Sequence, residues 1–279
     1  MQPGITESTM SVGESLYEVR VFIPSAASPD APLPTVLVFH GGGGSGTGLA
    51  EVDGFEDLAV SEGFVVVHPS ADPAWPLWAI EDADHPERPD VAFAERLSDT
   101  LISDWRADAA RIYAVGWSIG GTFSARLARE IPERLAGIGA AGQVAVAPQL
   151  GDPPVPMPLI QINGTDDPVI PFDGSGQTIA TGAPDSWRWM LETAIPEAFH
   201  AGAVRRGCIS EPTVFSVSDH VVGYRYSNCD GDVEMLRCEI IGGGHVWPGA
   251  VPSSSEMGSA TPNMSGASAM WDFLRAYSR

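Results

Sequence analysis

The chain has 279 residues, a length that one α/β sheet can organise around a single core. Hydrophobic residues make up 44% and charged residues 18%, a balance that favours a folded globular protein over general disorder. The formal net charge is −21 and no lysine occurs, so the surface should repel nucleic-acid phosphates and anionic membranes, and neither is expected as a partner.

The N-terminal segment Met1–Ser11 is polar and lacks the basic start and apolar run of a secretion signal. No stretch of the chain approaches the roughly 20 apolar residues needed to cross a bilayer. We also find no internal repeat, charge block or long linker. The sequence therefore predicts one domain over residues 1–279, without an export signal or a membrane span.

Strand and helix patterns alternate along the rest of the chain. Continuous apolar runs rich in β-branched residues predict strands covered on both faces, and apolar residues at helical spacing predict helices that lie on a sheet. The expected strands are Tyr17–Ile23, Thr35–Phe39, Phe64–Val67, Arg111–Val115, Pro158–Ile162, Val214–Tyr226 and Val233–Ile241. The expected helices are Gly54–Ser61, Val91–Trp105, Ile119–Arg129, Asp185–Val204 (interrupted by Pro196) and Ala267–Tyr277, and Gly174–Pro184 is expected to be a loop. This alternation predicts an α/β fold with a doubly wound, mostly parallel sheet and helices on both faces.

The only G-x-S-x-G sequence runs from Gly116 to Gly120, between a strand pattern and a helix pattern. A serine at such a turn is held in a strained backbone with its hydroxyl above the sheet, and the flanking glycines leave room for it. An ordinary turn is the alternative, because the chain holds 31 glycines. The flanking strand and helix favour Ser118 as a nucleophile.

A serine hydroxyl is a weak nucleophile until a neighbouring base takes its proton. His245 follows a predicted strand in a glycine-rich segment, where the backbone can turn an imidazole toward the edge of a sheet. His68, His85, His200 and His220 lie in less constrained contexts and are read as surface or core residues. His245 is therefore the predicted base.

The base in turn needs a carboxylate that fixes its tautomer. Asp166 and Asp167 both follow a predicted buried strand, and Asp167 is favoured because strand, Gly, Thr, one residue and Asp is the usual acid position in the α/β-hydrolase fold. The order Ser118, Asp167, His245 is that of α/β-hydrolases and differs from the chymotrypsin and subtilisin orders. The sequence therefore predicts an α/β-hydrolase fold and a serine hydrolase.

Backbone N–H groups must stabilise the oxyanion of the tetrahedral intermediate. The N–H of Ile119, directly after the nucleophile, should be one donor, and the glycine run after His40 should supply the other, with Gly42 preferred and Gly43 the alternative. His40 is expected to brace this run by hydrogen bonding. A phosphate-binding loop is the competing interpretation, but no Gly-Lys-Ser or Gly-Lys-Thr follows the run.

Metal and cofactor sites are not expected, because the sequence contains no His-Glu-x-x-His and no paired Cys-x-x-Cys. The three cysteines are Cys208, Cys229 and Cys238, and their spacing does not choose among the three single pairings. Cys208 with Cys229 is the preferred pairing, because it would tether the loop between them, and free buried thiols are the alternative.

The motifs together resemble the secreted esterase family that includes polyhydroxybutyrate depolymerases, feruloyl esterases and acetylxylan esterases. The resemblance covers the chain from about Tyr17 onward and rests on these sequences: a Leu-Pro-x-Val-Leu-Val-x-His-Gly strand, Asp90-Val91-Ala92-Phe93, Asp108-x-x-Arg111-Ile112-Tyr113, Gly164-Thr165-x-Asp167-Pro168-Val169 and Gly-Gly-Gly-His245-x-Trp247-Pro248-Gly249. It implies a single-domain extracellular enzyme that cleaves polyester, feruloyl or acetyl esters, without a cofactor. It also implies a disulfide near Cys208 and Cys229.

The chain departs from this family beside the nucleophile, since many members have Met or Leu before the serine and Asn after it. Here Trp117 and Ile119 occupy these positions, which puts the identity of the substrate in doubt. Trp117, Trp247 and Trp78, and Trp75 in the same loop as Trp78, could form a rim of indoles for a sugar, phenolic or polyester substrate. Ordinary core packing is the competing explanation for each of them.

The same three side chains could serve other chemistry. An acyltransferase would pass the acyl group to an alcohol in place of water, and a serine peptidase would cleave an amide. A non-catalytic binding protein on the same fold is a further alternative, although such proteins usually lose a member of the triad. The expected partner is an ester substrate, and the sequence makes no prediction of oligomeric state.

Overall fold

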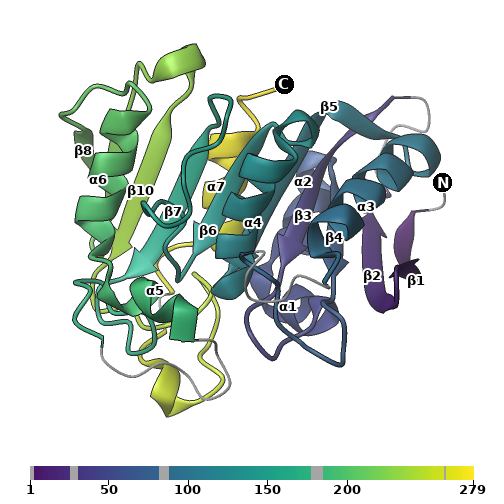
Figure 1. Ribbon diagram of the computed structural model, residues 1–279, viewed down its shortest axis with the longest axis horizontal. Coiled ribbons are helices and arrows are strands. Elements are labelled where there is room, and N and C mark those ends of the chain that lie inside the picture. The colour runs from purple at the N-terminus through teal and green to yellow at the C-terminus, as the bar shows by residue number, and fades with distance from the viewer. Residues whose placement is uncertain (1–2, 26–30, 82–87, 177–184, 261) are drawn as a thin grey trace.

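The computed structural model describes residues 3–25, 31–81, 88–176, 185–260 and 262–279. A 10-stranded sheet in the order β1-β2-β4-β3-β5-β6-β7-β10-β9-β8 runs through the molecule (Figure 1). The strands are β1 (Gly4–Val12), β2 (Ser15–Ile23), β3 (Leu33–Phe39), β4 (Val65–Pro69), β5 (Ala107–Trp117), β6 (Gly137–Ala141), β7 (Leu159–Gly164), β8 (Thr213–Ser218), β9 (Val221–Tyr226) and β10 (Met235–Ile240).

The centre of the sheet is parallel and its two edges are antiparallel. Strands β4, β3, β5, β6, β7 and β10 run parallel to their neighbours in this order, whereas β1 and β2 form an antiparallel edge on one side and β9 and β8 on the other. Every residue of β4 is buried, because helices cover both faces of the central strands. The prediction of a mostly parallel, doubly wound sheet is confirmed.

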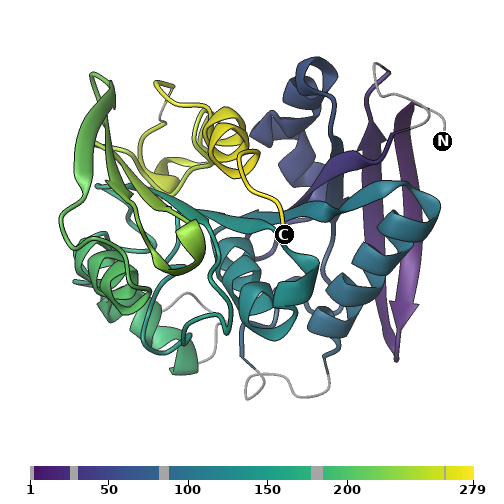
Figure 2. The ribbon, with the colours of Figure 1, turned by 90° about the horizontal axis from the view of Figure 1, so that it is seen from above.

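The helices form two layers, one on each side of the sheet (Figure 2). They are α1 (Gly46–Asp53), α2 (Phe55–Glu62), α3 (Asp90–Asp104), α4 (Ile119–Glu130), α5 (Trp189–Glu192), α6 (Ile195–Arg205) and α7 (Gly266–Leu274). Helices α3, α4 and α6 cover one face, and α1, α2 and α7 cover the other. Each layer has its own buried apolar cluster against the sheet, with Phe123 and Phe199 in one and Phe55 and Trp271 in the other.

Several elements differ from the sequence prediction. Strand β1 falls within a polar segment, because an edge strand exposes most of its side chains and needs no apolar alternation. Strand β6 (Gly-Ile-Gly-Ala-Ala) lacks the expected bulky residues because α7 packs directly onto it: a Cβ on Gly139 would lie 3.0 Å from the sulfur of Met270. The predicted strand Val214–Tyr226 is a hairpin of β8 and β9.

The predicted helix Asp185–Val204 is divided into a short 3-10 turn (Asp185–Arg188), α5 and α6. Pro196 stands in the first turn of α6, where its missing N–H costs no hydrogen bond, so it begins a helix and does not interrupt one. Of the predicted loop Gly174–Pro184, residues 177–184 lie outside the described part of the chain.

A disulfide joins Cys208 and Cys229, which confirms the favoured pairing. Cys238 is a free, buried thiol on β10, and burial raises its pKa to about 12. Among the described residues, no helix combines the length and the apolar composition that a bilayer span requires.

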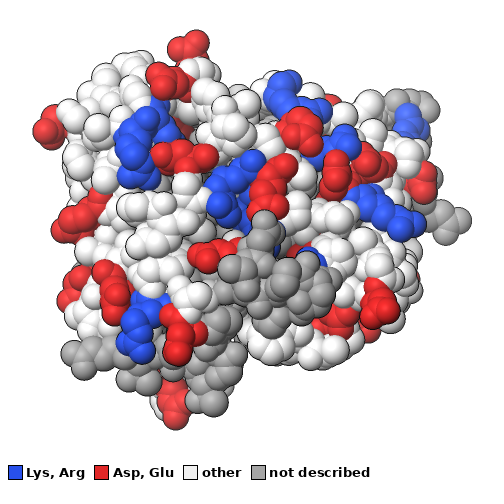
Figure 3. All heavy atoms as spheres, viewed as in Figure 1, with Lys and Arg blue, Asp and Glu red and all other residues white. Residues whose placement is uncertain are grey.

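Arginine and acidic side chains are interspersed on the face shown in Figure 3. Arg134 lies 3.0 Å from Asp99, and Arg205 lies 2.8 Å from Asp152. Because most arginines on this face adjoin a carboxylate, its described part carries no extended basic patch of the kind that binds nucleic-acid phosphates.

Candidate active site

Ser118 stands at the turn between β5 and α4, with backbone angles φ 53° and ψ −127°. This positive φ is costly for a residue with a side chain, and tight packing of the turn maintains it. A Cβ on Gly116 would lie 2.3 Å from the carbonyl oxygen of Gly120, and a Cβ on Gly120 would lie 2.2 Å from the carbonyl oxygen of Phe39. The two glycines of the G-x-S-x-G sequence therefore allow the turn to close against β3.

The three predicted triad side chains form one chain of hydrogen bonds. His245 Nε2 lies 2.9 Å from Ser118 Oγ, and His245 Nδ1 lies 2.8 Å from Asp167 Oδ2. A carboxylate only accepts hydrogen bonds, so Nδ1 carries the proton and Nε2 is left to accept from the serine hydroxyl. The side chains of His245 and Asp167 are both almost completely buried, and this shields their hydrogen bond from water.

The second oxygen of Asp167 fixes the carboxylate. Oδ1 accepts the backbone N–H groups of Val169 and Ile170, each at 2.8 Å. Asp166, the alternative acid, is exposed and accepts a hydrogen bond from the Thr165 hydroxyl at 3.2 Å. The structure thus places Asp167 and not Asp166 against His245.

The loop that carries His245 is tied to the loop that carries Asp167. The N–H of Asp166 donates to Gly243 O at 2.9 Å, and the N–H of Gly242 donates to Thr165 Oγ1 at 2.9 Å. A Cβ on Gly164 would lie 2.2 Å from Gly243 O, so the two loops touch through their backbones. These loops follow β7 and β10, which are adjacent in the sheet.

A third segment holds the imidazole from the other side. The N–H of His245 donates to Met257 O at 2.7 Å, and the N–H of Gly244 donates to Ser259 O at 3.1 Å. Sequence reasoning did not find Met257 or Ser259, because both contribute only backbone carbonyls and their side chains carry no signal. This contact explains why the run before His245 ends in glycine: a Cβ on Gly244 would lie 2.2 Å from Met257 O, so a side chain would prevent the close approach of the two backbones.

The glycine run after β3 lies beside the nucleophile. A Cβ on Gly41 would lie 3.2 Å from the Cβ of Ser118. The N–H of Gly43 donates to Pro76 O at 2.8 Å, and the N–H of Gly44 donates to Gly41 O at 3.1 Å, so neither is available to a substrate. Within the described residues, the N–H groups of Gly42 and Ile119 donate to no other group, which leaves both for an oxyanion.

His40 braces the glycine run. Its Nδ1 donates to Gly41 O at 2.7 Å, and its Nε2 accepts the N–H of Ala71 at 3.0 Å, a pattern that requires the neutral imidazole. Burial is the main cause that lowers the pKa of His40 to about 4. His40 therefore acts as a fixed structural link at neutral pH, as the sequence predicted.

The structure contradicts the prediction of an indole rim for Trp78 and Trp247. Trp78 is 0% exposed and stacks on Phe123 with ring centroids 4.9 Å apart, and Trp247 is 1% exposed and donates its indole N–H to Asp53 O at 3.0 Å. Both rings fill the core on either side of the sheet, because burying so large an apolar surface outweighs leaving it at a rim. Trp117 is partly exposed, with its ring centroid 5.6 Å from that of His245.

The other histidines that the structure describes form no hydrogen bond with a triad side chain. His68 is buried with its Nε2 2.7 Å from Asp53 Oδ2, and His200 Nδ1 lies 3.3 Å from the hydroxyl of Tyr226. His85 lies outside the described residues. In the part of the chain that the structure describes, no group of three or more His, Cys, Asp or Glu side chains could hold a metal ion.

Comparisons with known proteins find that the chain is similar to esterases. The chain is 30% identical over 267 residues to the putative esterase NocK of Nocardia uniformis subsp. tsuyamanensis, a match that covers 89% of this chain and 77% of the relative. It is 25% identical to feruloyl esterase B of Piromyces equi, over 94% of this chain and 45% of the relative, so it spans less than half of that longer protein. No protein-family model matches the chain.

A solved structure shares the fold over almost the whole length. Acetyl xylan esterase from Aspergillus awamori superposes with a TM-score of 0.64 at 13% sequence identity, covering 98% of this chain and 99% of that one. At this identity the match shows the architecture of the sheet and its helices.

Proposed function

The chain belongs to the α/β-hydrolase esterases, as do its feruloyl and acetylxylan esterase relatives, and from this premise we propose that Ser118, His245 and Asp167 together cleave carboxylic esters through an acyl-enzyme intermediate. The observation that carries the proposal is the continuous chain of hydrogen bonds from Ser118 Oγ through His245 to Asp167 Oδ2. Each of these bonds falls within the range expected of a working triad.

In the first half of the reaction, Ser118 Oγ attacks the carbonyl carbon of the ester while its proton passes to His245 Nε2. The imidazolium that results is stabilised by Asp167, which keeps accepting from Nδ1–H. The tetrahedral intermediate then collapses, the bond to the alkoxy oxygen breaks, and Nε2 returns the proton to the leaving alcohol. The acyl group remains on Ser118 as an ester.

The N–H groups of Gly42 and Ile119 are the proposed oxyanion donors. Support comes from their places in the chain, since Ile119 follows Ser118 and Gly42 follows Gly41, which lies against Ser118, and from the absence of other acceptors for them among the described residues. Ile119 also begins α4, so its N–H lies at the positive end of the helix dipole. Donors held in advance by the fold need no reorganisation when the negative charge develops.

In the second half, water takes the place of the alcohol and releases the acid by the same proton transfers in reverse. Transfer of the acyl group to an alcohol, or attack on an amide, would use the same groups. Assays with an added alcohol or with an amide substrate would detect these reactions by their products. The substrate class we propose is an acetyl, feruloyl or polyester ester, as in the relatives named for feruloyl and acetylxylan esters. Trp117 is the proposed substrate-binding indole, since it lies beside His245.

We further propose that residues 1–279 act as one catalytic domain outside the cell. The single sheet that runs through all described strands supports one domain. The Cys208–Cys229 disulfide supports an oxidising compartment, because such bridges are rare where thiols are kept reduced.

The test is hydrolysis of nitrophenyl acetate by the wild type and by Ser118→Ala, with and without a serine-directed phosphonate. Removal of the nucleophile should lower kcat by a factor on the order of 10⁴ or more. The phosphonate should attach one phosphonyl group per molecule to the wild type and none to Ser118→Ala, as read by mass spectrometry. Ester hydrolysis that persists in Ser118→Ala would reject the proposal. A panel of methyl ferulate, acetylated xylan and polyhydroxybutyrate would then identify the acyl group.

A further inference from the structure

The segment from Trp75 to Ala79 braces the proposed oxyanion donor from outside. Pro76 O accepts the N–H of Gly43 at 2.8 Å. The Cδ2 atom of Leu77 lies 2.8 Å from the position that a Cβ on Gly42 would occupy, so this side chain rests directly on the Gly42 backbone. The direction of the Gly42 N–H therefore depends on where the segment lies.

The segment has no helix or strand of its own, and side chains from distant parts of the chain hold its two ends. At one end, Arg88 Nη1 donates to Trp75 O at 2.8 Å. At the other, the N–H of Ala79 donates to Asp90 Oδ2 at 2.8 Å, and Arg126 Nη1 of α4 donates to Ala79 O at 2.9 Å. The segment's own backbone bonds, from the N–H of Trp75 to Asp72 O at 2.9 Å and from the N–H of Leu77 to Trp75 O at 2.7 Å, are local turns, so the side-chain bonds at its ends are what tie it to α3 and α4.

Asp90 and Arg88 form the centre of this arrangement. Asp90 is completely buried at the start of α3, and its Oδ1 accepts from Arg88 Nη2 at 2.9 Å and from the hydroxyl of Tyr17 at 2.6 Å. Burial, followed by the adjacent Asp90 carboxylate, raises the pKa of Tyr17, so its hydroxyl stays protonated and keeps donating. A buried carboxylate with donors from β2, from the segment and from Arg88 is fixed in orientation.

We propose that Asp90 and Arg88 are positioning residues for the oxyanion hole, acting through Pro76 and Leu77 on the backbone of Gly42. The inference rests on the proposed function, because it assigns a role in the same reaction. Neither side chain touches Ser118 or His245, so neither is a catalytic residue. Their loss should impair stabilisation of the oxyanion while the triad hydrogen bonds stay intact.

The experiment compares an ester with its thiono analogue, in which sulfur replaces the carbonyl oxygen. Sulfur is larger and a weaker hydrogen-bond acceptor, so the thiono ester gains little from the oxyanion donors, and the ratio of the two rates measures the oxyanion hole itself. The variants are Asp90→Asn, Arg88→Gln and Tyr17→Phe, with the concentration of working enzyme obtained by phosphonate titration of Ser118. Because rates are counted per titrated serine, partial misfolding of a variant does not enter the ratio.

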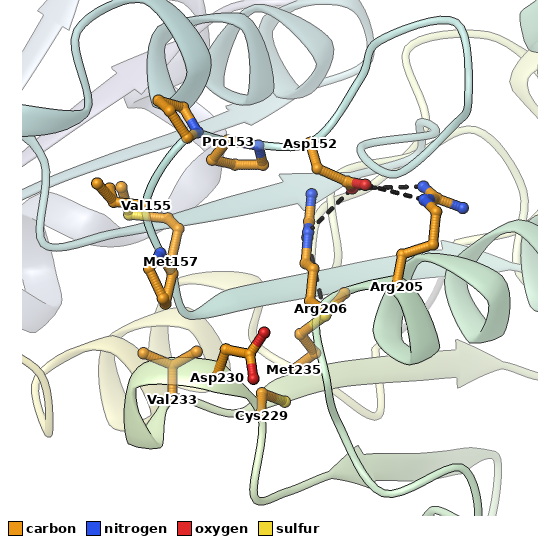
Figure 4. Close-up of a pocket in the computed structure, with 12 residues that line it drawn as sticks. Asp152, Pro153, Val155, Met157, Arg205, Arg206, Cys229, Asp230, Val233 and Met235 are labelled. Atoms are coloured by element: carbon orange, nitrogen blue, oxygen red, sulfur yellow. Dashed lines mark hydrogen bonds and ion pairs between the residues drawn. The ribbon is translucent and has the colours of Figure 1, made fainter.

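A matched control lies at the opposite end of the parallel strands. Asp152 accepts from Arg205 Nε at 2.8 Å and from Arg206 Nε at 3.2 Å, in a cavity of about 180 Å³ that Met235 at the start of β10 also lines (Figure 4). Asp152→Asn likewise removes a carboxylate that accepts from two donors, but far from the glycine run. It should leave the ratio of oxo to thiono rates unchanged.

For Arg88→Gln we expect kcat on the oxo ester to fall about 10-fold or more at a nearly unchanged KM, with a much smaller fall on the thiono ester. Asp90→Asn should follow in the same direction and Tyr17→Phe more weakly. Ratios equal to the wild-type value in Arg88→Gln and Asp90→Asn would overturn the inference. A wild-type enzyme that hydrolyses neither ester would instead contradict the proposed function, so the two failures are distinguishable.

Discussion

The two ends of the parallel strands hold their polar groups in different ways. At the carboxyl ends of β5, β7 and β10, buried side chains join one loop to another, as Asp167 does with His245. At the opposite end, Asp152 is shared between Arg205 and Arg206 in a half-open cavity near the disulfide. The first arrangement fixes direction, and the second mainly neutralises charge.

The difference follows from burial. A hydrogen bond shielded from water keeps its geometry, because breaking it would leave buried polar groups without any hydrogen-bond partner, which is energetically costly. Partly exposed ion pairs exchange with water at little cost. Substitutions at the carboxyl ends should therefore change the rate, and substitutions in the ion pairs at the opposite end should change stability by small amounts.

The largest effect should come from Asp167→Asn. An amide NH₂ facing Nδ1 would force the tautomer that carries its proton on Nε2, so His245 could not accept from Ser118. We expect kcat to fall by about 10⁴, measured with nitrophenyl acetate. Asp166→Asn is the matched control and should keep wild-type turnover, and equal losses in the two variants would refute the assignment of Asp167.

Trp78→Ala tests the assignment of this indole to the core. Removing a ring that is 0% exposed and packs on Phe39 and Phe123 should lower the free energy of unfolding by about 3–5 kcal/mol, measured by urea denaturation. Val214→Ala on the exposed edge strand β8 serves as a control with little change. An unaltered denaturation midpoint in Trp78→Ala would restore the idea of a surface rim.

The disulfide should contribute to stability and not to turnover. The bridge between Cys208 and Cys229 closes 21 residues of chain, so its removal in a Cys208→Ser, Cys229→Ser double variant should cost about 3 kcal/mol in thermal or chemical unfolding. Turnover of the folded fraction should stay at the wild-type value. A large fall in kcat with intact folding would show that this end of the sheet does reach the active site.

His40 should make the active-site end sensitive to acid. Its pKa is lowered to about 4 in the folded state from 6.5, so between these values the unfolded chain binds a proton that the folded chain does not. Stability from this group is present above about pH 6.5 and is lost as the pH falls toward 4, by about 3 kcal/mol in total. The measurement is urea denaturation from pH 7 to 4 for wild type and His40→Gln, and parallel curves for the two would contradict it.

The smallest effect is expected for Arg205→Ala. The ion pair with Asp152 is about one-third exposed on each side, so its loss should cost at most about 1 kcal/mol and should weaken further in high salt. Thermal unfolding at low and high ionic strength checks this. A loss of several kcal/mol would mean that this end is as tightly organised as the other.

Much of the site could be predicted because each triad residue belongs to a short local pattern at a strand end. Ser118, Asp167 and His245 follow strand patterns directly, and parallel strands bring their carboxyl ends to one edge. The choice of Asp167 over Asp166 also rested on a local spacing. The order of strands in the sheet then supplies the convergence that a linear sequence does not display.

The tryptophans could not be placed in this way. The direction of the Trp78 ring depends on how Arg88, Asp90 and Arg126 hold the segment around it, and those contacts span up to 47 positions. Strand β6 could not be predicted for a related reason. Its glycines leave room for side chains of α7, which comes more than a hundred residues later in the chain. Local patterns identify groups that act at strand ends, whereas packing partners far along the chain decide which large side chains are covered.

The backbone hydrogen bonds between the Asp167 and His245 loops join these two residues into one rigid unit. Strand β6 separates that unit from β5, which leads into Ser118. A change in twist between β5 and β7 would thus alter the gap between Oγ and Nε2 while the imidazole and its carboxylate travel together. Such a change would therefore alter the hydrogen bond between Ser118 and His245 more than the one between His245 and Asp167.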